Sequence, residues 1–478
     1  MAIAEYGELD GVALAELIAQ GEISPAEVLE EAIDRAEIAN PQLNAIILKD
    51  YEAARARADD LPKGPFQGVP FLIKDIVNQP LAGLKCSHGS KWLKDYVPPS
   101  DSTLISRYKA VGLNIFGKTN TPEFAITGTT EGGHLGPCRN PWNTDYSTGG
   151  SSGGAASAVA AGILPMAHSS DGLGSIRIPA ASCGLVGLKP TRDRNPHGPN
   201  DGDRHISFQQ DHIVSRSVRD TAAMLDATGF PEPASPYAPP PRPAGSFLAE
   251  CGAPVGKLRI AFSDERPNGQ GAADDVRKVM LDTAKILESM GHIVEEAAPQ
   301  TDWRKLYRAQ GAVSSSNLAA AVAELTEMVG RAPQEDELEP LTWAGVHTGR
   351  KLTGDKVLGG WRTLRVLCRE ILGFYETYDV FLCPTMITTP PPIGFIDPVN
   401  LPPAEVSKRQ AKTYGYTPPQ NFTGQPSISL PLGQGDNGLP VGMMFSARYG
   451  DEATLLRLSA ALEEAMPWRN RQPEMARA

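Results

Sequence analysis

Hydrophobic positions along the chain switch repeatedly between helical and strand spacing. In residues 10–38 apolar side chains recur at helical intervals, which predicts two amphipathic helices broken near Gly21. Ser24 and Pro25 suit the N-cap and the first position of the second helix. The apolar run Pro70–Ile73 predicts a buried strand, which is followed directly by a lysine and an aspartate.

Similar patterns continue through the rest of the chain. Further helices are predicted at residues 51–60, 102–111, 155–161, 272–290, 306–329, 364–377 and 452–464. Further strands are predicted at residues 113–116, 258–262, 293–296, 380–383, 425–431 and 441–445. Because helices and strands interchange throughout, the pattern predicts an α/β protein with a sheet covered by helices.

The domain organisation follows from length and from one proline-rich segment. A length of 478 residues allows two or three domains. Residues 230–256 are rich in proline and are predicted to form a surface linker or insertion. Single large α/β domains also exist at this length, and the segment suits an insertion within one domain, so the chain is not divided there.

Composition and charge narrow the class of protein. The net charge of −11 argues against nucleic acid or an anionic membrane as the main partner. The six cysteines are scattered, without zinc-like spacing, which predicts reduced thiols and no metal site. The apolar stretch at residues 155–167 is too short to cross a bilayer. The acidic opening residues lack the pattern of a secretory signal, so the cytoplasm is the expected location.

Glycine and serine dominate residues 147–190, and such loops let backbone N–H groups approach a ligand closely. No GxSxG nucleophile elbow is present, and no Lys-Ser or Lys-Thr pair follows the glycines as in a phosphate-binding loop. Among the histidines, His168 alone lies near these loops, and it is expected to pack at a strand end. Considered one at a time, three residues of interest have ordinary structural interpretations. Lys74 would be a solvated lysine, Ser151 a serine in a turn, and Ser175 the N-cap of a helix or turn.

Seven stretches in consistent order resemble the amidase signature family. They are residues 74–75, 117–124, 149–154, 171–180, 183–191, 378–385 and 424–431. The family usually has two glycines immediately before its nucleophile, whereas this chain has Leu173 and Gly174 there. The nylon-oligomer hydrolases of 6-aminohexanoate cyclic dimer type, within this family, show a similar departure. Residues 167–171 and 183–191 also resemble the corresponding stretches of those enzymes.

The resemblance implies an amidase that cleaves a carboxamide-type C–N bond through an acyl-enzyme. Ser175 takes the position of the nucleophile, Ser151 that of a bridging serine held by a cis peptide bond, and Lys74 that of the base. A lysine can accept a proton only when neutral, and burial favours that state. In this relay Lys74 takes a proton from Ser151, which takes one from Ser175.

The same resemblance assigns supporting roles around the nucleophile. The backbone N–H groups expected to form the oxyanion hole are those of Gly172, Leu173, Gly174 and Ser175. The side chains expected to brace the loop are those of Ser152, Ser170, Asp171 and Arg177. The pocket walls are expected from residues 127–136, 195–212 and 303–420. Four aromatic residues are candidates for these walls or for the core: Trp303, Trp343, Trp361 and Tyr414.

The resemblance implies a single amidase signature domain over residues 1–478, with residues 1–60 as an N-terminal helical segment packed on it. The implied fold is a mixed, twisted central β-sheet covered by helices on both faces, and no metal or cofactor is implied. The implied substrate is a small amide, cyclic amide, ester or carbamate (urethane), and the family allows a homodimer. Two alternatives stay open: the amidase subunit of an amidotransferase complex, and an inactive relative acting as a scaffold. The joint presence of Lys74, Ser151 and Ser175 favours an active enzyme.

Overall fold

The computed structural model describes residues 3, 6–199, 208–266 and 269–476. Among these, the main sheet has eight strands. In spatial order they are β12 (Ile293–Glu296), β11 (Arg259–Phe262), β13 (Val380–Pro384), β15 (Pro440–Ala447), β14 (Ser427–Gln434), β9 (Val186–Lys189), β10 (Gln210–Ser215) and β8 (Met166–Asp171). β11 runs parallel to both β12 and β13, whereas the other neighbours are antiparallel, so the sheet is mixed.

A second, three-stranded sheet lies beside β8. Its order is β1 (Ile46–Lys49), β3 (Asn114–Thr119) and β2 (Pro70–Lys74). The Lys74 backbone N–H donates to His168 Nδ1 at 3.3 Å, which ties the end of β2 to β8. Two short hairpins follow β3: β4 (Glu131–Gly132) with β5 (Gly136–Pro137), and β6 (Arg139–Asn140) with β7 (Asn143–Ser147).

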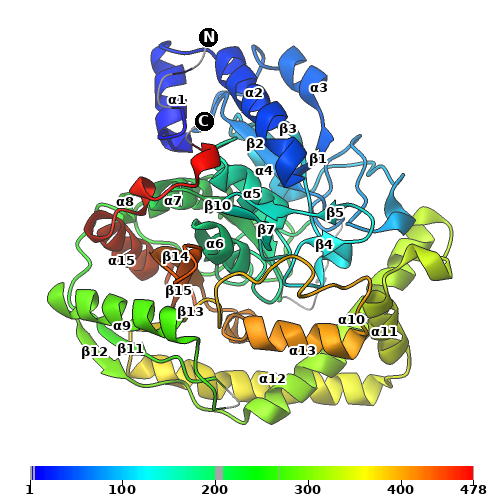
Figure 1. Cartoon of the computed structure of the whole chain (residues 1–478), viewed down its shortest axis with the longest axis vertical. Coiled ribbons are helices and arrows are strands. Elements are labelled where there is room, and N and C mark those ends of the chain that lie inside the picture. Colours follow the sequence, from blue (N-terminus) through cyan, green and yellow to red (C-terminus); the bar gives the residue numbers. More distant parts are fainter. Residues whose placement is uncertain (1–2, 4–5, 200–207, 267–268, 477–478) are drawn as a thin grey trace.

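Helices cover both faces of the main sheet. In chain order, the helices of the described residues are α1 (Gly11–Gln20), α2 (Pro25–Leu43), α3 (Tyr51–Ala56), α4 (Thr103–Ala110), α5 (Gly153–Ala160), α6 (Arg177–Cys183), α7 (Val218–Thr228), α8 (Phe247–Glu250), α9 (Asp274–Ser289), α10 (Trp303–Val329), α11 (Pro340–Arg350), α12 (Gly354–Gly373), α13 (Pro403–Thr413), α14 (Pro418–Thr423) and α15 (Glu452–Ala465). Helices α1–α3 gather at one end of the molecule, and α10–α13 lie at the opposite end (Figure 1).

Strand alternation explains how the two faces are covered. Successive side chains of a strand point to opposite faces. Met443 and Phe445 of β15 share an apolar cluster with α7, α9 and α15. Met444, between them, packs on the other face with Tyr375 and Tyr416. The predicted α/β class, with a mixed sheet covered on both faces, is confirmed.

Most predicted elements fall within a few residues of the observed ones, but the helix predicted at 364–377 differs. Helix α12 begins earlier, at Gly354, and continues through a Gly-Gly pair at 359–360. Glycine disfavours helix in isolation, but tertiary packing overrides this weak preference. Leu364 and Leu367 of α12 pack against Leu306 and Val313 of α10.

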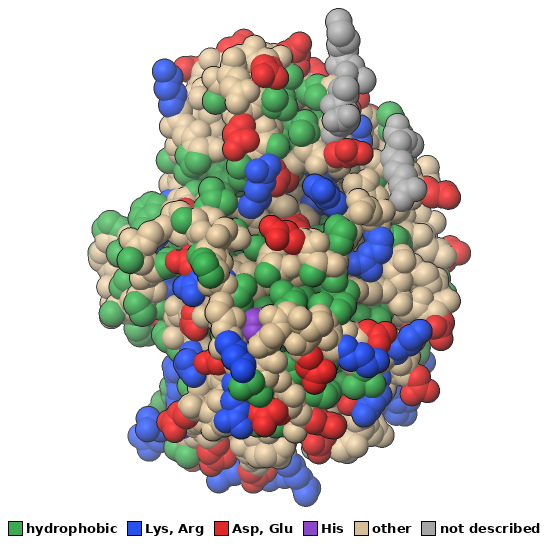
Figure 2. Space-filling model, turned by 90° about the vertical axis from the view of Figure 1, so that its left-hand side faces the viewer, with side chains coloured by type: hydrophobic (Ala, Val, Ile, Leu, Met, Phe, Trp, Pro, Cys, Tyr) green, Lys and Arg blue, Asp and Glu red, His purple; other side chains and the backbone are tan. Residues whose placement is uncertain are grey.

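Two further findings concern the surface. Residues 231–246 are largely exposed, and the segment 230–256 also contains the short helix α8, whose Phe247 is fully buried. On the face drawn in Figure 2, acidic and basic side chains are interspersed. No helix of the described residues has the length and apolar character needed to cross a membrane.

Candidate active site

Lys74, at the end of β2, has a fully buried side chain. Its Nζ donates to Ser151 Oγ at 2.7 Å, Ser152 Oγ at 2.9 Å and Ser170 Oγ at 2.9 Å. Burial lowers the pKa of the Lys74 ammonium from 10.5 to about 7, although the negative charges of Asp211 and Asp171 oppose this effect. Near neutral pH this lysine can therefore exist without its proton, surrounded by hydroxyl groups.

Ser151 and Ser152 lie immediately before α5. The peptide bond between Gly150 and Ser151 is cis, and the Ser151 carbonyl accepts a hydrogen bond from Thr121 Oγ1 at 2.9 Å. A side chain at position 150 would meet the backbone of Thr129 at 2.6 Å, so the close approach of these two segments requires glycine. The sequence around position 150 thus lets the Ser151 side chain reach Lys74.

A buried carboxylate organises the loop between β8 and α6. Asp171 accepts hydrogen bonds from the backbone N–H groups of Gly174 at 2.6 Å and Ile176 at 3.2 Å. Arg177 pairs with both carboxylate oxygens at 2.9 Å. Burial alone would raise the pKa of Asp171, but the charge and hydrogen bonds of Arg177 prevail and lower it to about 2. Asp171 therefore stays ionised and ties the loop around Ser175.

A cavity of about 670 Å³ opens onto this loop. Ser151, Ser170, Gly172, Leu173 and Ser175 line one part of it. Its other walls come from residues 76–78, 124–128, α10, α11, α13 and the segment leading into α14. The cavity lining contains no aspartate, glutamate, lysine or arginine among the described residues, and its polar atoms belong mainly to amide and hydroxyl groups.

Comparison with known proteins covers almost the whole chain. A family model described as Amidase matches residues 27–456. A 6-aminohexanoate-cyclic-dimer hydrolase of Paenarthrobacter ureafaciens is 35% identical, over 98% of this chain and 96% of that protein. An acylamidase of Rhodococcus erythropolis is 33% identical, over 97% of both chains. A solved structure of 6-aminohexanoate cyclic dimer hydrolase complexed with substrate matches with a TM-score of 0.93 and 33% identity, over 98% of this chain and 99% of that one.

The chain belongs to the amidase family. It is an amide hydrolase acting on C–N bonds, with the amidase signature fold, and its substrate is a small amide. The relatives matched by sequence and by structure include the cyclic-dimer hydrolases that the sequence resembles around Leu173.

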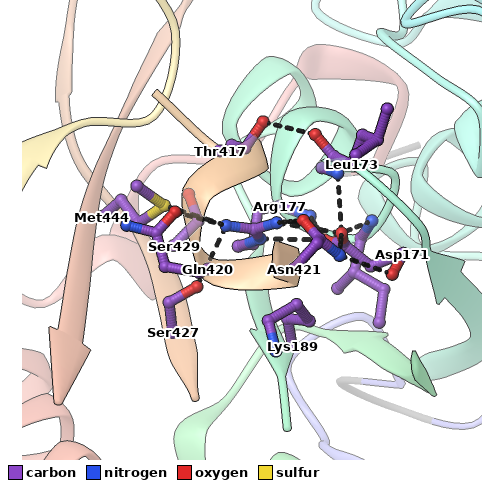
Figure 3. Close-up of polar contacts among 12 residues, drawn as sticks. Asp171, Leu173, Arg177, Lys189, Thr417, Gln420, Asn421, Ser427, Ser429 and Met444 are labelled. Atoms are coloured by element: carbon purple, nitrogen blue, oxygen red, sulfur yellow. Dashed lines mark hydrogen bonds and ion pairs between the residues drawn. The ribbon is translucent and has the colours of Figure 1, made fainter. Parts of the chain in front are cut away.

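Leu173, where this amidase departs from its family, fits the loop because its side chain turns to an apolar cluster. It is partly buried and packs against the apolar cluster that contains Phe208 and Phe422. The Leu173 carbonyl accepts a hydrogen bond from Thr417 Oγ1 at 2.7 Å (Figure 3). Gly174 has a φ of 136°, and a side chain there would lie 2.3 Å from Thr417 Oγ1. The glycine at 174 is required by this path, whereas position 173 accommodates a large side chain.

The backbone N–H groups around Ser175 are not equivalent. The Gly174 N–H, expected as an oxyanion donor, instead donates to Asp171 Oδ1 at 2.6 Å. The N–H groups of Gly172, Leu173 and Ser175, which lie outside helices and strands, have no hydrogen-bond acceptor among the described residues. In the described part of the chain, the Ser175 hydroxyl has no hydrogen-bond partner, and Ser175 is partly exposed to the cavity.

Asn421, which the sequence did not single out, also helps to hold the loop around Ser175. Asn421 of α14 donates through Nδ2 to the Asp171 carbonyl at 2.8 Å and to Asp171 Oδ1 at 2.9 Å, and its Oδ1 accepts from Arg177 Nη2 at 2.6 Å. In Figure 3 it lies between Asp171 and Arg177. In the sequence, only the position of Asn421, three residues before the 424–431 motif, suggested that it lies near the active site.

His168 lies within β8 rather than at a strand end, and it is fully buried. Its Nδ1 accepts from the Lys74 backbone, and its Nε2 lies 3.3 Å from Asp211 Oδ1. Of the candidate aromatic wall residues, Tyr414 lines the cavity, whereas Trp303, Trp343 and Trp361 do not. Thr127, Gly128 and Gln209 fall in the other two predicted wall segments.

Proposed function

We propose that this amidase cleaves neutral amides through an acyl-enzyme on Ser175, with Ser151 passing protons between Ser175 and Lys74. The observation that carries the proposal is the 2.7 Å contact between Lys74 Nζ and Ser151 Oγ in a site buried deeply enough to lower the lysine pKa to about 7. A base with a pKa near the working pH combines availability with proton affinity.

The reaction begins when neutral Lys74 takes the proton of Ser151 as Ser151 takes that of Ser175. The Ser175 oxygen then forms a bond to the amide carbon, and the carbonyl oxygen becomes an oxyanion. As the C–N bond breaks, the leaving nitrogen receives a proton from Ser151, which is resupplied by Lys74. Water then attacks the acyl-enzyme with the same relay as base, which releases the acid and restores Ser175.

We assign the oxyanion donors to the N–H groups of Gly172, Leu173 and Ser175. Gly174 is left out because its N–H already donates to Asp171. Preorganised donors of this kind are usually the largest contribution to catalysis of acyl transfer. The supporting role of Asp171 and Arg177 is to hold this loop.

Ser152 and Ser170 have a different supporting role. Both accept hydrogen bonds from Lys74, and Ser152 Oγ also lies 3.3 Å from the Ser170 backbone N–H and 3.2 Å from the Ser170 carbonyl. We propose that these hydroxyls orient the lysine toward Ser151 without taking part in proton transfer.

The proposed substrate class follows from the cavity wall. Among the described residues this wall has no Asp, Glu, Lys or Arg. Moving a charged group from water into a wall without a counter-charge costs several kcal/mol, so a substrate carboxylate or ammonium there is disfavoured. Ile126, Leu318, Leu325 and Leu341 offer apolar contacts instead. A cyclic amide, the kind of substrate that we infer from the name of the 35% identical relative, suits this largely apolar lining. Esters and carbamates share the same acyl chemistry and are further candidates.

The remaining features of the molecule support three smaller proposals. We propose that residues 1–478 form a single domain, since α2 and β2 share one apolar core with α5 and β8. We propose a cytoplasmic location, since all six cysteines are free. The net charge of −11 and the mixed charges in Figure 2 support a small-molecule substrate without nucleic acid. A homodimer stays a prediction of the family resemblance.

The substrate proposal is tested with paired amides of equal length, one neutral and one carrying a carboxylate on the acyl chain. We expect kcat/KM for the neutral amide to be at least about 100-fold higher, because the described residues of the cavity lining include no lysine or arginine. Ser175→Ala serves as the control and should hydrolyse neither. Equal kcat/KM values for the pair, with Ser175→Ala inactive, would overturn the substrate class while leaving the relay intact.

A further inference from the structure

The peptide unit between Leu173 and Gly174 is held at both of its polar ends. Its carbonyl oxygen accepts from Thr417 Oγ1 at 2.7 Å, and its N–H donates to Asp171 Oδ1 at 2.6 Å. Figure 3 shows the Thr417 hydroxyl directed at the Leu173 carbonyl, on the side of the loop opposite Asp171. A peptide unit is planar, so contacts at both ends fix its rotation about the chain direction.

Thr417 is itself tightly placed. It is buried, with 1% of its surface exposed, and it stands immediately before α14. Its Oγ1 lies so near Gly174 that a side chain at 174 would overlap it. Asn421, one turn later in α14, holds Asp171 through both the backbone carbonyl and the carboxylate. The N-cap residue Thr417 and Asn421 within α14 therefore hold the loop at two separate points.

We propose that Thr417 is a positioning residue that sets the oxyanion hole of this amidase. This inference rests on the proposed acyl-enzyme function of Ser175. The N–H groups on either side of the held peptide belong to Leu173 and Ser175, and both residues line the cavity. Fixing the peptide between them fixes the directions of these two donors. Thr417 also lines the cavity, but its hydroxyl is bonded to the Leu173 carbonyl and not to Lys74, Ser151 or Ser175.

Removing the hydroxyl leaves the Leu173 carbonyl without its donor and allows the peptide to rotate toward another partner. The two flanking donors then spend less time directed at the oxyanion. Loss of one oxyanion donor costs about 100- to 1000-fold in kcat, so partial misdirection of two donors is expected to cost about 10- to 100-fold. The effect falls on kcat, because the oxyanion forms only in the transition state.

The test compares Thr417→Val with Thr417→Ser. Valine keeps the shape without the hydroxyl, and serine keeps the hydroxyl with less volume. Thr423→Val is the matched control, because Thr423 is a buried threonine of the same helix whose Oγ1 bonds to Pro419 O and Gln425 Oε1, away from the loop. Each protein is assayed for kcat, KM, melting temperature and inhibition by a boronic acid that forms a tetrahedral adduct on serine.

We expect Thr417→Val to lower kcat about 10- to 100-fold and to weaken the boronic acid by a similar factor, with KM within about threefold. Thr417→Ser should recover most of the loss, and Thr423→Val should keep wild-type kcat whatever its melting temperature. Wild-type kcat in Thr417→Val, or equal losses in the valine and serine variants, would overturn the inference. Full activity in Ser175→Ala would instead overturn the proposed function on which it rests.

Discussion

Replacing Lys74 with methionine separates the role of this side chain in catalysis from its effect on stability. Methionine has a similar length, remains uncharged at every pH and cannot accept a proton. The proposed relay therefore stops, and amide hydrolysis should be lost. The effect on folding is expected to change sign with pH, because the wild-type lysine is buried at a cost that depends on its protonation.

The magnitude follows from the pKa of Lys74, which is about 7 in the folded protein against 10.5 ordinarily. Between these values the unfolded chain binds more protons than the folded protein, so the wild-type contribution to stability rises with pH. At about 1.36 kcal/mol per pH unit, burial of the lysine costs about 5 kcal/mol below pH 7 and nothing above pH 10.5. Methionine removes this cost.

Methionine also removes the hydrogen bonds from Nζ to Ser151, Ser152 and Ser170. At about 1 kcal/mol each, their loss costs about 3 kcal/mol at any pH. Lys74→Met should therefore be about 2 kcal/mol more stable than wild type below pH 7 and about 3 kcal/mol less stable above pH 10.5. Wild type and Lys74→Met should be equally stable at about pH 8.

Urea unfolding followed by tryptophan fluorescence, at about pH 6 and about pH 10, measures both differences. Ser175→Ala is the control, because it removes the nucleophile without touching Lys74, and its stability should match wild type at both pH values. A Lys74→Met protein that is several kcal/mol less stable than wild type at the lower pH would contradict a destabilising buried ammonium, since Lys74 would then be stabilising in its charged form.

Three further outcomes are expected. In a pH series, kcat/KM should rise about tenfold per pH unit up to about pH 7 and then level off, because only neutral Lys74 accepts a proton; a steady fall above neutrality in folded protein would contradict a lysine base. Arg177→Met should lower stability by about 3 kcal/mol or more in thermal unfolding, because it leaves the Asp171 carboxylate buried without its partner; an unchanged melting temperature would argue against the loop account. Leu173→Gly should lower stability by about 2 to 4 kcal/mol through lost packing against the apolar cluster that contains Phe208, yet keep kcat within about tenfold, since the family usually has glycine there. Loss of kcat without loss of stability would reverse this assignment.

The sequence allowed the regular elements and the small-residue loops to be predicted, for identifiable reasons. Amphipathic helices such as α2 and α9 have clear apolar spacing, and Ser24 does cap α2 as expected. The run Pro70–Ile73 is bounded and wholly apolar, so β2 was predicted directly. The glycines at 149 and 150 predict close approach of the backbone to neighbouring segments, and the structure shows such an approach at both positions.

Other features could not be predicted because their partners lie far away in the sequence. β8 is a buried strand that carries His168, Ser169 and Ser170, which are polar and show no apolar alternation. These side chains are tolerated there because Lys74 and Asp211 hydrogen-bond to two of them. Burial of this kind depends on tertiary contacts that no local pattern reveals.

The hydrogen bonds that hold the oxyanion loop are a second example. Thr417 and Leu173 are 244 residues apart, and their contact brings a side-chain hydroxyl to a backbone carbonyl. Neither a motif nor a periodicity signals such a pair. The Gly174 N–H illustrates the same limit, because its position in the motif suggested an oxyanion donor, whereas the carboxylate three residues earlier accepts it.

In the proposed mechanism Ser175 is a nucleophile activated by Ser151 and Lys74. Intact-mass spectrometry after treatment with a fluorophosphonate measures this activation, with Ser175→Ala, Ser151→Ala and Lys74→Met alongside. We expect one added label on the wild type, mapped to Ser175, no label on Ser175→Ala, and labelling slowed by about 100-fold or more in the two relay variants. An unlabelled wild type that is folded and hydrolyses amides, or a label that persists in Ser175→Ala, would contradict the proposed mechanism.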